Sequence, residues 1–491
     1  MESLKVQNDL QGIPIDRLTP AEGLRPLNPD TRELIRFIIF GSIFFLACAA
    51  AKIFFISALV ILFFAFRYLQ GRFDPVDALV VVLSVVPWLG VYRYLGFSFS
   101  FDRGFVILAL ASLRGAYGPP RRRFLSNTLD FSLAGFLAAC ALTAACSFMY
   151  RTPFRILLGS LLIPFGYYLV AKNCVRRPDL LPKLYVAAVI AILAFGTLGL
   201  FEAVTKVDVL PYGEKELDDF RINGPMRMAE DYGVCLNFLL LFFFAMRSMR
   251  QESPLSSRFR RIVPLLGIVN CYFTLTRGIW LSLAAGWLVQ AAKRDFRFVL
   301  RIIPVLALVL WIFFKLIMPA IASNVVQSRL NNERTINARI ATYKSAVAMF
   351  EDYPVLGVGF AAFNEMWERY PDRYQKEYKE EASVSSPHNI FFCLLSETGI
   401  IGVASFAFFM FQVFRCSLRL ARHAPSAAHR EYGLFVLSAA MAYLVAGMGL
   451  HLIRNIDFPN EYLFIFLGIL SGMIDLLGLS ARHPSGARMG G

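Results

Sequence analysis

Charged residues are scarce in this chain. Asp, Glu, Lys and Arg make up 17% of its 491 residues, whereas hydrophobic residues make up 57%. A soluble globular domain averages about 25% charged residues, so a soluble enzyme fits this composition poorly. Apolar runs such as 181–204, 232–245 and 434–450 recur along most of the length. Since a membrane span needs ~20 apolar residues, we count roughly twelve to fourteen spans and predict an all-α, polytopic transmembrane helical bundle.

Motifs for disulfides and metals are also missing. Eight cysteines are present, but none lies in the long polar segment 321–388 and no CxxC pair occurs. This pattern argues against a disulfide framework or a structural zinc site. The polar loops expected outside the membrane contain no Asp-x-Asp pair and no His/Asp cluster with metal-ligand spacing. We therefore expect no metal and no cofactor.

The net charge of +15 has two interpretations. The first is binding to the negatively charged backbone of nucleic acid. However, no basic cluster is interleaved with stacking aromatics in a soluble segment, so we expect no nucleic-acid partner. Basic loops instead set the topology of membrane proteins, because cytoplasmic loops are rich in Lys and Arg. The four strongly basic segments predicted to be cytoplasmic are 114–123, 247–261, 293–301 and 415–430.

Two polar segments have a different charge pattern and are expected on the outer side. Segment 205–227 contains five acidic residues, and segment 321–388 has eight Lys or Arg against nine Asp or Glu. The second segment is the only long polar insertion, and it has helix-like stretches around 339–350 and 363–370. We therefore predict a small ordered extracytoplasmic subdomain rather than a linker.

These spans and charges predict the organisation of the whole chain. The N-terminal tail is polar and proline-containing, so we expect it to be flexible and see no signal peptide in it. The predicted parts are a cytoplasmic tail (1–34), N-terminal spans (35–204), a first outer loop (205–227), further spans (228–320), a large outer loop (321–388), C-terminal spans (389–480) and a cytoplasmic tail (481–491).

Residues 262–292 form a 31-residue apolar run that contains one charged residue, Arg277. As one helix this run would extend ~46 Å, well beyond a ~30 Å hydrocarbon core, and both of its flanks are basic. It is therefore a candidate re-entrant hairpin that turns at 276–278. An arginine in such a run is costly unless it faces a polar cavity, so Arg277 is a functional candidate. The alternative is an arginine at a helix end that reaches the lipid phosphates.

His388 stands where the large polar loop meets the next apolar helix. Pro387 fits the start of a helix, and Asn389 is expected to cap it. Histidine accepts a proton near neutral pH, so His388 suits a general base for an acceptor hydroxyl. The alternative is an interfacial histidine without a chemical role. That alternative is preferred for the histidines at 423, 429 and 483, whereas His451 fits either interpretation.

Further candidates flank His388 in the sequence. Arg339 begins a helix-like stretch, and Gly357 and Gly359 permit a tight turn or a close backbone approach. The alternative is an amphipathic interfacial helix followed by an ordinary turn. Glu397 lies inside an apolar run, where a carboxylate needs a partner, either an arginine or backbone donors. Three more charged residues in the outer loops are either functional or only surface charge, namely Arg221, Arg454 and Asp457.

Several arginines and one histidine thus gather on one membrane face. Arginine matches phosphate oxygens in a fork and keeps its charge at any relevant pH. A site that stabilises a departing diphosphate without a metal needs such arginines. A lipid-linked diphosphate substrate would also explain why the site is embedded among spans.

The C-terminal half resembles the O-antigen ligase and polymerase superfamily over roughly residues 220–420. The matching pieces occur in the same order as in that family, and they are Thr276-Arg277-Gly278, Arg339 with Pro354-Val355-Leu356-Gly357-Val358-Gly359, and Pro387-His388-Asn389 with Glu397-Thr398-Gly399-Ile400-Ile401-Gly402. Two positions depart from the family pattern, with Thr276 in place of a common serine and Tyr343 in place of a common tryptophan. Neither departure removes a charged candidate.

The resemblance implies an inner-membrane glycosyltransferase of the GT-C type. Such enzymes move a glycan from undecaprenyl diphosphate to an acceptor at the periplasmic face, without a metal and with inversion at the sugar. The acceptor is lipid A–core for ligases and a second lipid-linked repeat unit for polymerases of lipopolysaccharide or exopolysaccharide. By this resemblance Arg277 and Arg339 bind the diphosphate with help from Arg221, and His388 activates the acceptor. Asn389, Glu397, the two glycines, Arg454 and Asp457 are expected to support them.

Two other classes of protein remain as alternatives. A polysaccharide or lipid-linked sugar transporter or flippase would also be polytopic, but transporters often contain two related halves, and no internal repeat is found here. A non-catalytic assembly scaffold would not need the set of arginines and a histidine. The extra N-terminal spans favour a polymerase slightly over a ligase.

Overall fold

The computed structural model describes residues 74–85, 106–113, 125–147, 151–207, 221–252, 259–295, 333–370, 387–454 and 458–479, together with residues 70, 87 and 297. Throughout these ranges the regular elements are helices, which confirms the predicted all-α fold. Both predicted tails, 1–34 and 481–491, lie outside the described residues, as do 208–220 of the first outer loop and 321–332 and 371–386 of the large one.

The helices fall into four groups along the chain. The N-terminal group is α4 (Pro75–Ser84), α7 (Thr128–Ala145), α8 (Arg151–Leu157), the π-helical turn η3 (Leu158–Leu162), α9 (Ile163–Cys174) and α10 (Leu180–Thr205). The middle group is α11 (Ala229–Ala245), α12 (Arg247–Glu252), α13 (Phe259–Phe273) and α14 (Arg277–Arg294). The polar segment contributes α18 (Glu333–Asp352), α19 (Phe363–Met366) and η5 (Trp367–Arg369). The C-terminal group is α21 (Ile390–His423), α22 (Ala427–Gly447), η6 (Leu452–Arg454) and α23 (Pro459–Leu476).

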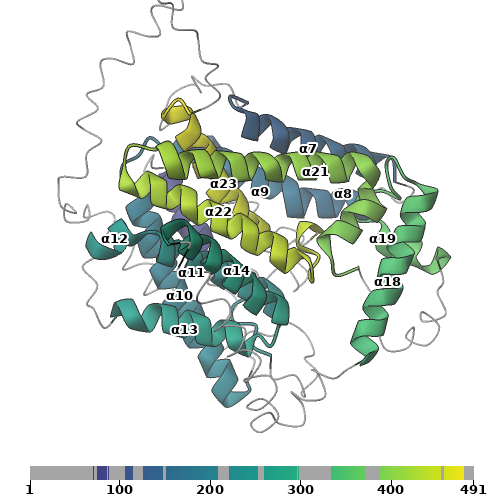
Figure 1. The fold of residues 1–491 in the computed structure, drawn as a ribbon, viewed down its shortest axis with the longest axis horizontal. Helices are drawn as coiled ribbons and strands as arrows, with labels where there is room; N and C mark the ends of the chain where they lie inside the picture. Colours follow the sequence, from purple (N-terminus) through teal and green to yellow (C-terminus); the bar gives the residue numbers. More distant parts are fainter. Residues whose placement is uncertain are drawn as a thin grey trace, which may run out of the picture.

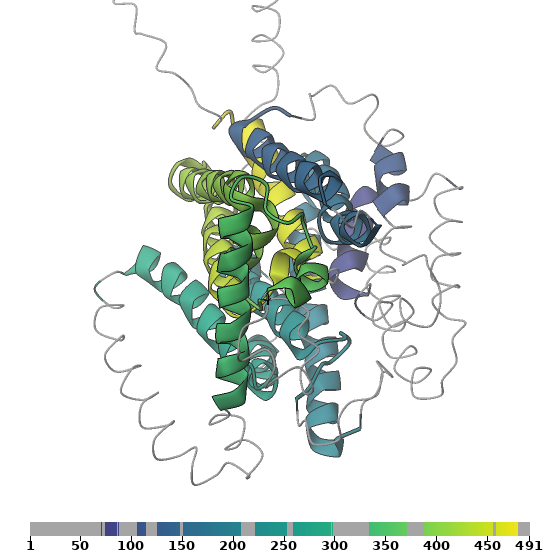
Figure 2. The same ribbon diagram turned by 90° about the vertical axis from the view of Figure 1, so that its right-hand side faces the viewer.

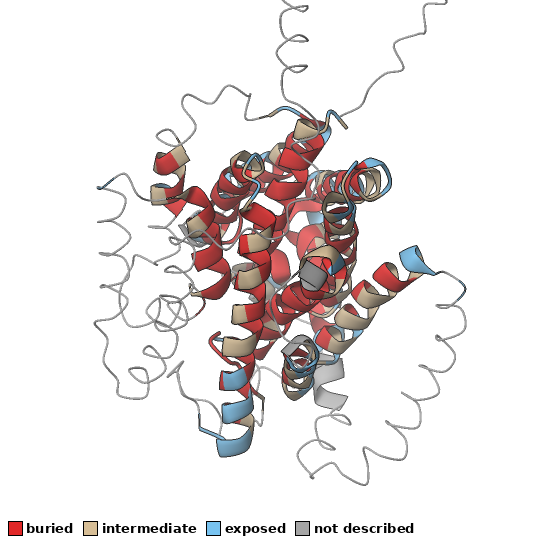
Figure 3. Cartoon of the chain, turned by 90° about the vertical axis from the view of Figure 1, so that its left-hand side faces the viewer, coloured by how far each residue is buried: buried red, intermediate tan, exposed pale blue. Residues whose placement is uncertain are grey.

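The long helices pack side by side and mix the beginning of the chain with its end. α21 lies between α7 and α22, and α23 packs along α9 (Figure 1). α14 packs against α22, and α10 packs against α13 and α4. One apolar core runs through these helices, and the buried residues gather at the centre of the bundle (Figure 3).

Four described helices are long and apolar enough to cross a membrane. They are Thr128–Ala145, Pro153–Cys174, Leu180–Thr205 and Ile390–His423, and two shorter apolar helices accompany them. Side chains such as Phe131, Phe201 and Phe408 are exposed on the outside of these helices, as expected where lipid replaces water. The total of roughly twelve to fourteen spans stays a prediction.

The apolar run 262–292 is divided into two helices. α13 ends at Phe273 and α14 begins at Arg277. Between them Leu275 adopts a positive φ of 47°, and Ile222 donates its backbone N–H to the Phe273 carbonyl at 3.3 Å. The break at 274–276 overlaps the expected turn 276–278 only at Thr276, and it places Arg277 in the first position of α14.

The polar segment lies at one end of the bundle. α18 crosses the ends of the bundle helices in Figure 2 and packs against α21. This segment has a small apolar cluster of its own, built from Ala346, Met349, Val358, Ala362, Phe363 and Met366. Phe392 of α21 packs against this cluster, so the segment is docked on the bundle through side chains.

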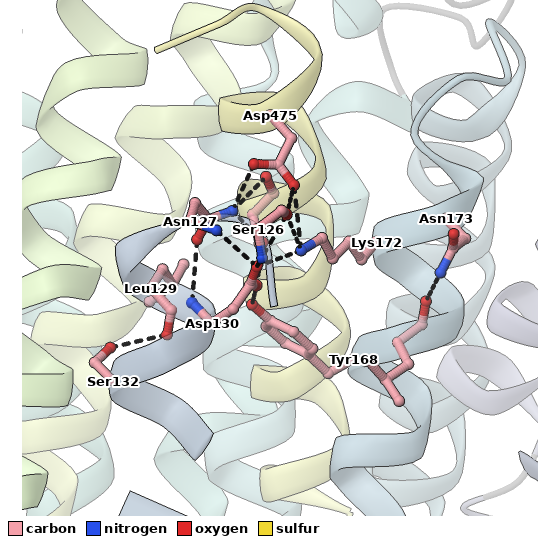
Figure 4. A network of polar contacts seen from close by, with 11 residues as sticks. Ser126, Asn127, Leu129, Asp130, Ser132, Tyr168, Lys172, Asn173 and Asp475 are labelled. Carbon is pink, nitrogen blue, oxygen red and sulfur yellow. Dashed lines mark hydrogen bonds and ion pairs between the residues drawn. The ribbon is translucent and has the colours of Figure 1, made fainter. Parts of the chain in front are cut away.

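A buried polar network joins the N-terminal helices to α23 at the other end (Figure 4). Asp130 of α7 forms an ion pair with Lys172 of α9 and accepts hydrogen bonds from Tyr168 at 2.5 Å and Ser471 at 2.6 Å. Nζ of Lys172 also lies 3.2 Å from Oδ2 of Asp475 in α23. Because charges inside a bundle need partners, this network ties α7, α9 and α23 together.

We predict that Lys172→Met lowers the thermal unfolding midpoint of the purified protein in detergent. Breaking a buried ion pair by removing one partner costs about 3–5 kcal/mol, and here two carboxylates would be left side by side. The control is Arg177→Met, whose side chain is 37% exposed. An exposed pair is worth about 0–1 kcal/mol, so equal losses in both variants would contradict this role of the network.

Candidate functional site

His388 has a strained backbone. Its φ is +46°, a region that a residue with a Cβ rarely adopts without compensation. The next residue supplies that compensation, because Asn389 caps α21 by accepting the backbone N–H groups of Phe391 at 2.9 Å and Phe392 at 3.3 Å. The predicted cap is therefore confirmed, and it fixes His388 directly in front of the helix N-terminus.

The loop between α22 and α23 faces His388. Asn389 donates through Nδ2 to the Met448 carbonyl at 2.9 Å, and Asn460 donates to the Leu452 carbonyl at 2.9 Å. This anchored loop places His451 against His388, with ring centroids 5.1 Å apart and the two Nδ1 atoms 3.4 Å apart. Two histidines that are 63 residues apart in the sequence thus share one contact.

Three charged groups act on His388. Burial lowers the pKa of its imidazole, and the positive charges of Arg339 and Arg454 lower it further, while Glu230 opposes them. Arg339 is exposed on α18, and its Nη1 would lie 4.0 Å from a Cβ placed on Gly449 in the α22–α23 loop. The guanidinium of Arg339 therefore lies near the loop that carries His451 and within electrostatic range of His388. As a result, His388 stays neutral to a lower pH than an ordinary histidine.

Arg221 and Arg277 are connected through the turn between α13 and α14. Arg221 forms an ion pair with Glu230 and donates to the Thr274 carbonyl at 3.1 Å and the Thr276 hydroxyl at 2.8 Å. Arg277 follows Thr276 directly and is exposed at the start of α14. A Cβ on Gly278 would meet no atom within 4 Å, so there is open space beside this helix N-terminus.

Glu397 belongs to a second polar cluster, deeper in the bundle. Its carboxylate lies 3.0 Å from Nη1 of Arg454 and accepts the backbone N–H groups of Ala361 at 2.9 Å and Phe363 at 3.3 Å. Arg454 also donates to the Ala361 carbonyl at 3.1 Å. Glu397 thus has both kinds of partner considered from the sequence, and Arg454 connects this cluster to the two histidines.

The turn 354–359 forms backbone hydrogen bonds with α21 at a break in that helix. Gly399 interrupts the helix with φ 58° and ψ −158°, and the peptide groups released there pair with the turn. Val358 and Gly359 donate to the carbonyls of Ser396 at 2.9 Å and Glu397 at 3.0 Å. Ile400 donates to the Pro354 carbonyl at 2.9 Å. Backbone groups in lipid need protein partners, so this pairing explains how a break inside the helix is tolerated.

The structure thus brings most of the predicted residues together. Arg339, Arg454 and Glu230 lie within electrostatic range of His388. Glu230 pairs with Arg221, and Arg221 is bonded to Thr276, the residue before Arg277. Asp457 lies outside the described residues. Glu230 was not predicted, although an acidic residue at the start of an apolar helix is a usable signal. Within the described ranges, no group of three His, Cys, Asp or Glu residues is arranged to hold a metal ion.

We predict that Gly357→Ala disrupts this docking and lowers the activity of the protein. Gly357 has φ +65°, and an added Cβ would lie 2.4 Å from the Glu397 carbonyl carbon and 2.5 Å from the Thr398 nitrogen, so backbone would have to move. The matched control is Gly135→Ala in α7, where an added Cβ meets nothing within 4 Å. Limited proteolysis of the polar segment measures the docking, and equal resistance of both variants would contradict the prediction.

Comparison with known proteins adds an independent observation. No curated protein matches the chain. Residues 262–407 match the family model described as O-antigen ligase, a range that includes Arg277, Arg339, His388 and Glu397. The predicted resemblance to the O-antigen ligase and polymerase superfamily is thereby confirmed for residues 262–407, which carry an O-antigen ligase domain.

Proposed function

We propose that this protein is a metal-independent, inverting glycosyltransferase. In this proposal it moves a glycan from undecaprenyl diphosphate to an acceptor hydroxyl at the periplasmic face of the bacterial inner membrane. The observation that carries the proposal is the position of His388, held neutral in front of the α21 N-terminus with the exposed guanidinium of Arg339 beside it. The O-antigen ligase domain supports the same reaction class.

His388 is the proposed general base. A base must be neutral before it accepts a proton, and the lowered pKa keeps the imidazole neutral at physiological pH. The helix dipole of α21 and the charges of Arg339 and Arg454 disfavour the protonated ring, so the proton acquired in the reaction is readily released afterwards. The backbone strain at this residue is typical of functional positions.

Arg339, Arg277 and Arg221 are the proposed diphosphate-binding residues. Arg339 and Arg277 are exposed, so a substrate can reach their guanidinium groups. Thr276 precedes α14 but forms no side-chain cap, and the open space beside Gly278 suits an anion at the positive end of the helix. Arg221 is held by Glu230 and Thr276, which suits a residue that orients the turn as well as adding charge.

The proposed reaction is a single displacement. The acceptor O–H gives its proton to His388 while the acceptor oxygen forms a bond to the anomeric carbon of the donor glycan. The bond from that carbon to the diphosphate oxygen breaks, and its electron pair leaves with undecaprenyl diphosphate. The arginines offset the negative charge that develops on the leaving group. One displacement from the opposite side inverts the anomeric centre.

The charge distribution along α21 supports a periplasmic position for the site. His388 precedes the first residue of α21, whereas the basic segment 415–430 covers its C-terminal end. Basic segments remain on the cytoplasmic side, so a spanning α21 would place His388 on the opposite side. The acceptor in this proposal is lipid A–core or a second lipid-linked repeat unit.

We predict that His388→Ala, Arg339→Ala and Arg277→Ala each abolish long-chain surface polysaccharide in a deletion strain complemented with the variant. Loss of a general base alone lowers a rate by about 10²–10⁴-fold. The matched control is His423→Ala, which changes an exposed histidine at the other end of α21 and should support normal polysaccharide. Membrane insertion is checked by immunoblot of the membrane fraction.

Gel electrophoresis of the polysaccharide from these strains distinguishes a polymerase from a ligase. A single repeat unit on lipid A–core in the deletion strain indicates a polymerase, whereas unmodified core with accumulating lipid-linked polymer indicates a ligase. Loss of a separate exopolysaccharide indicates a polymerase for that product. Full-length polysaccharide from all three variants would refute the proposal. Substrate uptake by purified protein in liposomes without glycosyl transfer would favour the transporter instead.

The lowered pKa of His388 leads to a pH prediction. The rate depends on the neutral base, so kcat/KM should fall as the pH drops through this pKa, which lies below the ordinary value of 6.5. Glu230 opposes the lowering, so Glu230→Gln should move the acid limb of the profile to still lower pH. An acid limb that moves to higher pH in this variant would contradict the assignment of His388 as the base.

A further inference from the structure

The contact between His388 and His451 depends on which ring nitrogen of each residue carries the proton. A neutral imidazole carries one proton, on either Nδ1 or Nε2, and the nitrogen without the proton is the one that can act as a base. The Nδ1 atoms of the two rings lie 3.4 Å apart and face each other. When both rings are neutral, a hydrogen bond between these atoms requires that one Nδ1 donates and the other accepts.

Both rings are neutral at physiological pH. Burial, together with His388 and Arg454, lowers the pKa of His451 to about 3, and the pKa of His388 is lowered as well. The charged groups that face the pair come from three elements: Arg339 on α18, Arg454 on η6 and Glu230 on α11. The negative charge of Glu230 acts on both rings, so a proton acquired by the pair is partly compensated.

The surroundings hold His451 in place. Its loop is tied to the N-terminus of α21 by the bond from Asn389 to the Met448 carbonyl and to α23 by the bond from Asn460 to the Leu452 carbonyl. α21 and α22 approach closely here, since a Cβ on Gly447 would lie 2.9 Å from Cγ2 of Ile390. A residue fixed in this way can orient a neighbouring ring rather than only filling space.

We propose that His451 is a positioning residue, whose Nδ1 accepts the Nδ1–H of His388 and so leaves Nε2 of His388 as the basic atom that faces the acceptor hydroxyl. This inference rests on the proposed function and deepens it. When His388 takes the acceptor proton on Nε2, its Nδ1–H bond to His451 strengthens, because the donor is now charged. No proton needs to move to His451, and the ring contacts neither substrate.

Three substitutions of His451 separate positioning from packing. In His451→Asn the amide oxygen can accept the same hydrogen bond, whereas His451→Phe keeps an aromatic ring without an acceptor. In His451→Asp an anion replaces the neutral acceptor and should raise the pKa of His388. The assay is glycosyl transfer by the full-length protein in liposomes, with the undecaprenyl-diphosphate-linked repeat unit as donor, followed as kcat and KM across pH.

We expect His451→Phe to lose about 10²-fold or more in kcat, as when a catalytic histidine loses the partner that sets its tautomer, with little change in the KM of the donor. His451→Asn should retain activity within about tenfold, since an acceptor atom is kept. His451→Asp should shift the acid limb of the kcat/KM profile to higher pH. If His451→Phe does not fold, the other two variants still decide the question.

A packing role makes the opposite prediction. His451→Phe would then keep more activity than His451→Asn, and the acid limb of the kcat/KM profile would stay in place in His451→Asp. Either result would overturn the inference. His388→Ala serves as the reference in the same assay. If His388→Ala is inactive while all His451 variants behave like the unmodified protein, only the role of His451 fails. If His388→Ala is fully active, the proposed function itself fails.

Discussion

The arrangement of the site depends on the buried charge of Glu397. A carboxylate inside a helical bundle is stable only when it is paired and hydrogen-bonded, and its partners come from two other segments. Arg454 supplies the opposite charge from the α22–α23 loop, and the turn after α18 supplies the N–H groups of Ala361 and Phe363. Removing one partner of such a pair costs about 3–5 kcal/mol. The α22–α23 loop also carries His451, and the turn follows directly on α18, which carries Arg339. The pairing of Glu397 therefore fixes the positions of these two residues relative to His388.

The helix break at Gly399 makes this pairing possible. An uninterrupted α21 would use its own carbonyls within the helix and would leave nothing for the turn 354–359 to bind. Because the break releases the carbonyls of Ser396 and Glu397, the turn can pair with them, and the polar segment is docked by backbone bonds as well as by its apolar cluster. The cost of a non-helical residue among membrane helices is thus offset by the attachment of a segment that lies outside them.

Local features of the sequence predicted the parts of this site well. The helix around Arg339, the cap at Asn389 and the break near Arg277 follow from short-range patterns, namely amphipathic spacing, an Asn before an apolar run, and a run too long for one span. The partners of these residues could not be predicted in the same way. Glu230 and His451 are more than 60 residues from His388 in the sequence, and only the packing of α11 and α22 against their neighbours brings them close. The identity of the arginine that pairs with Glu397 depends on the same packing.

The matched range of the family model contains some of the residues of the site but not all of them. The O-antigen ligase domain at 262–407 includes Arg277, Arg339 and His388, which the proposed mechanism assigns to the diphosphate and to the acceptor proton. Arg221 and Glu230 precede that domain, and His451 and Arg454 follow it. The flanking residues hold or tune the groups inside the domain, through the Arg221–Thr276 bond, the contact between the two histidines and the Arg454–Glu397 pair. In the proposed mechanism these contacts set the protonation and orientation of the central residues, and the reaction therefore depends on segments on both sides of the matched domain.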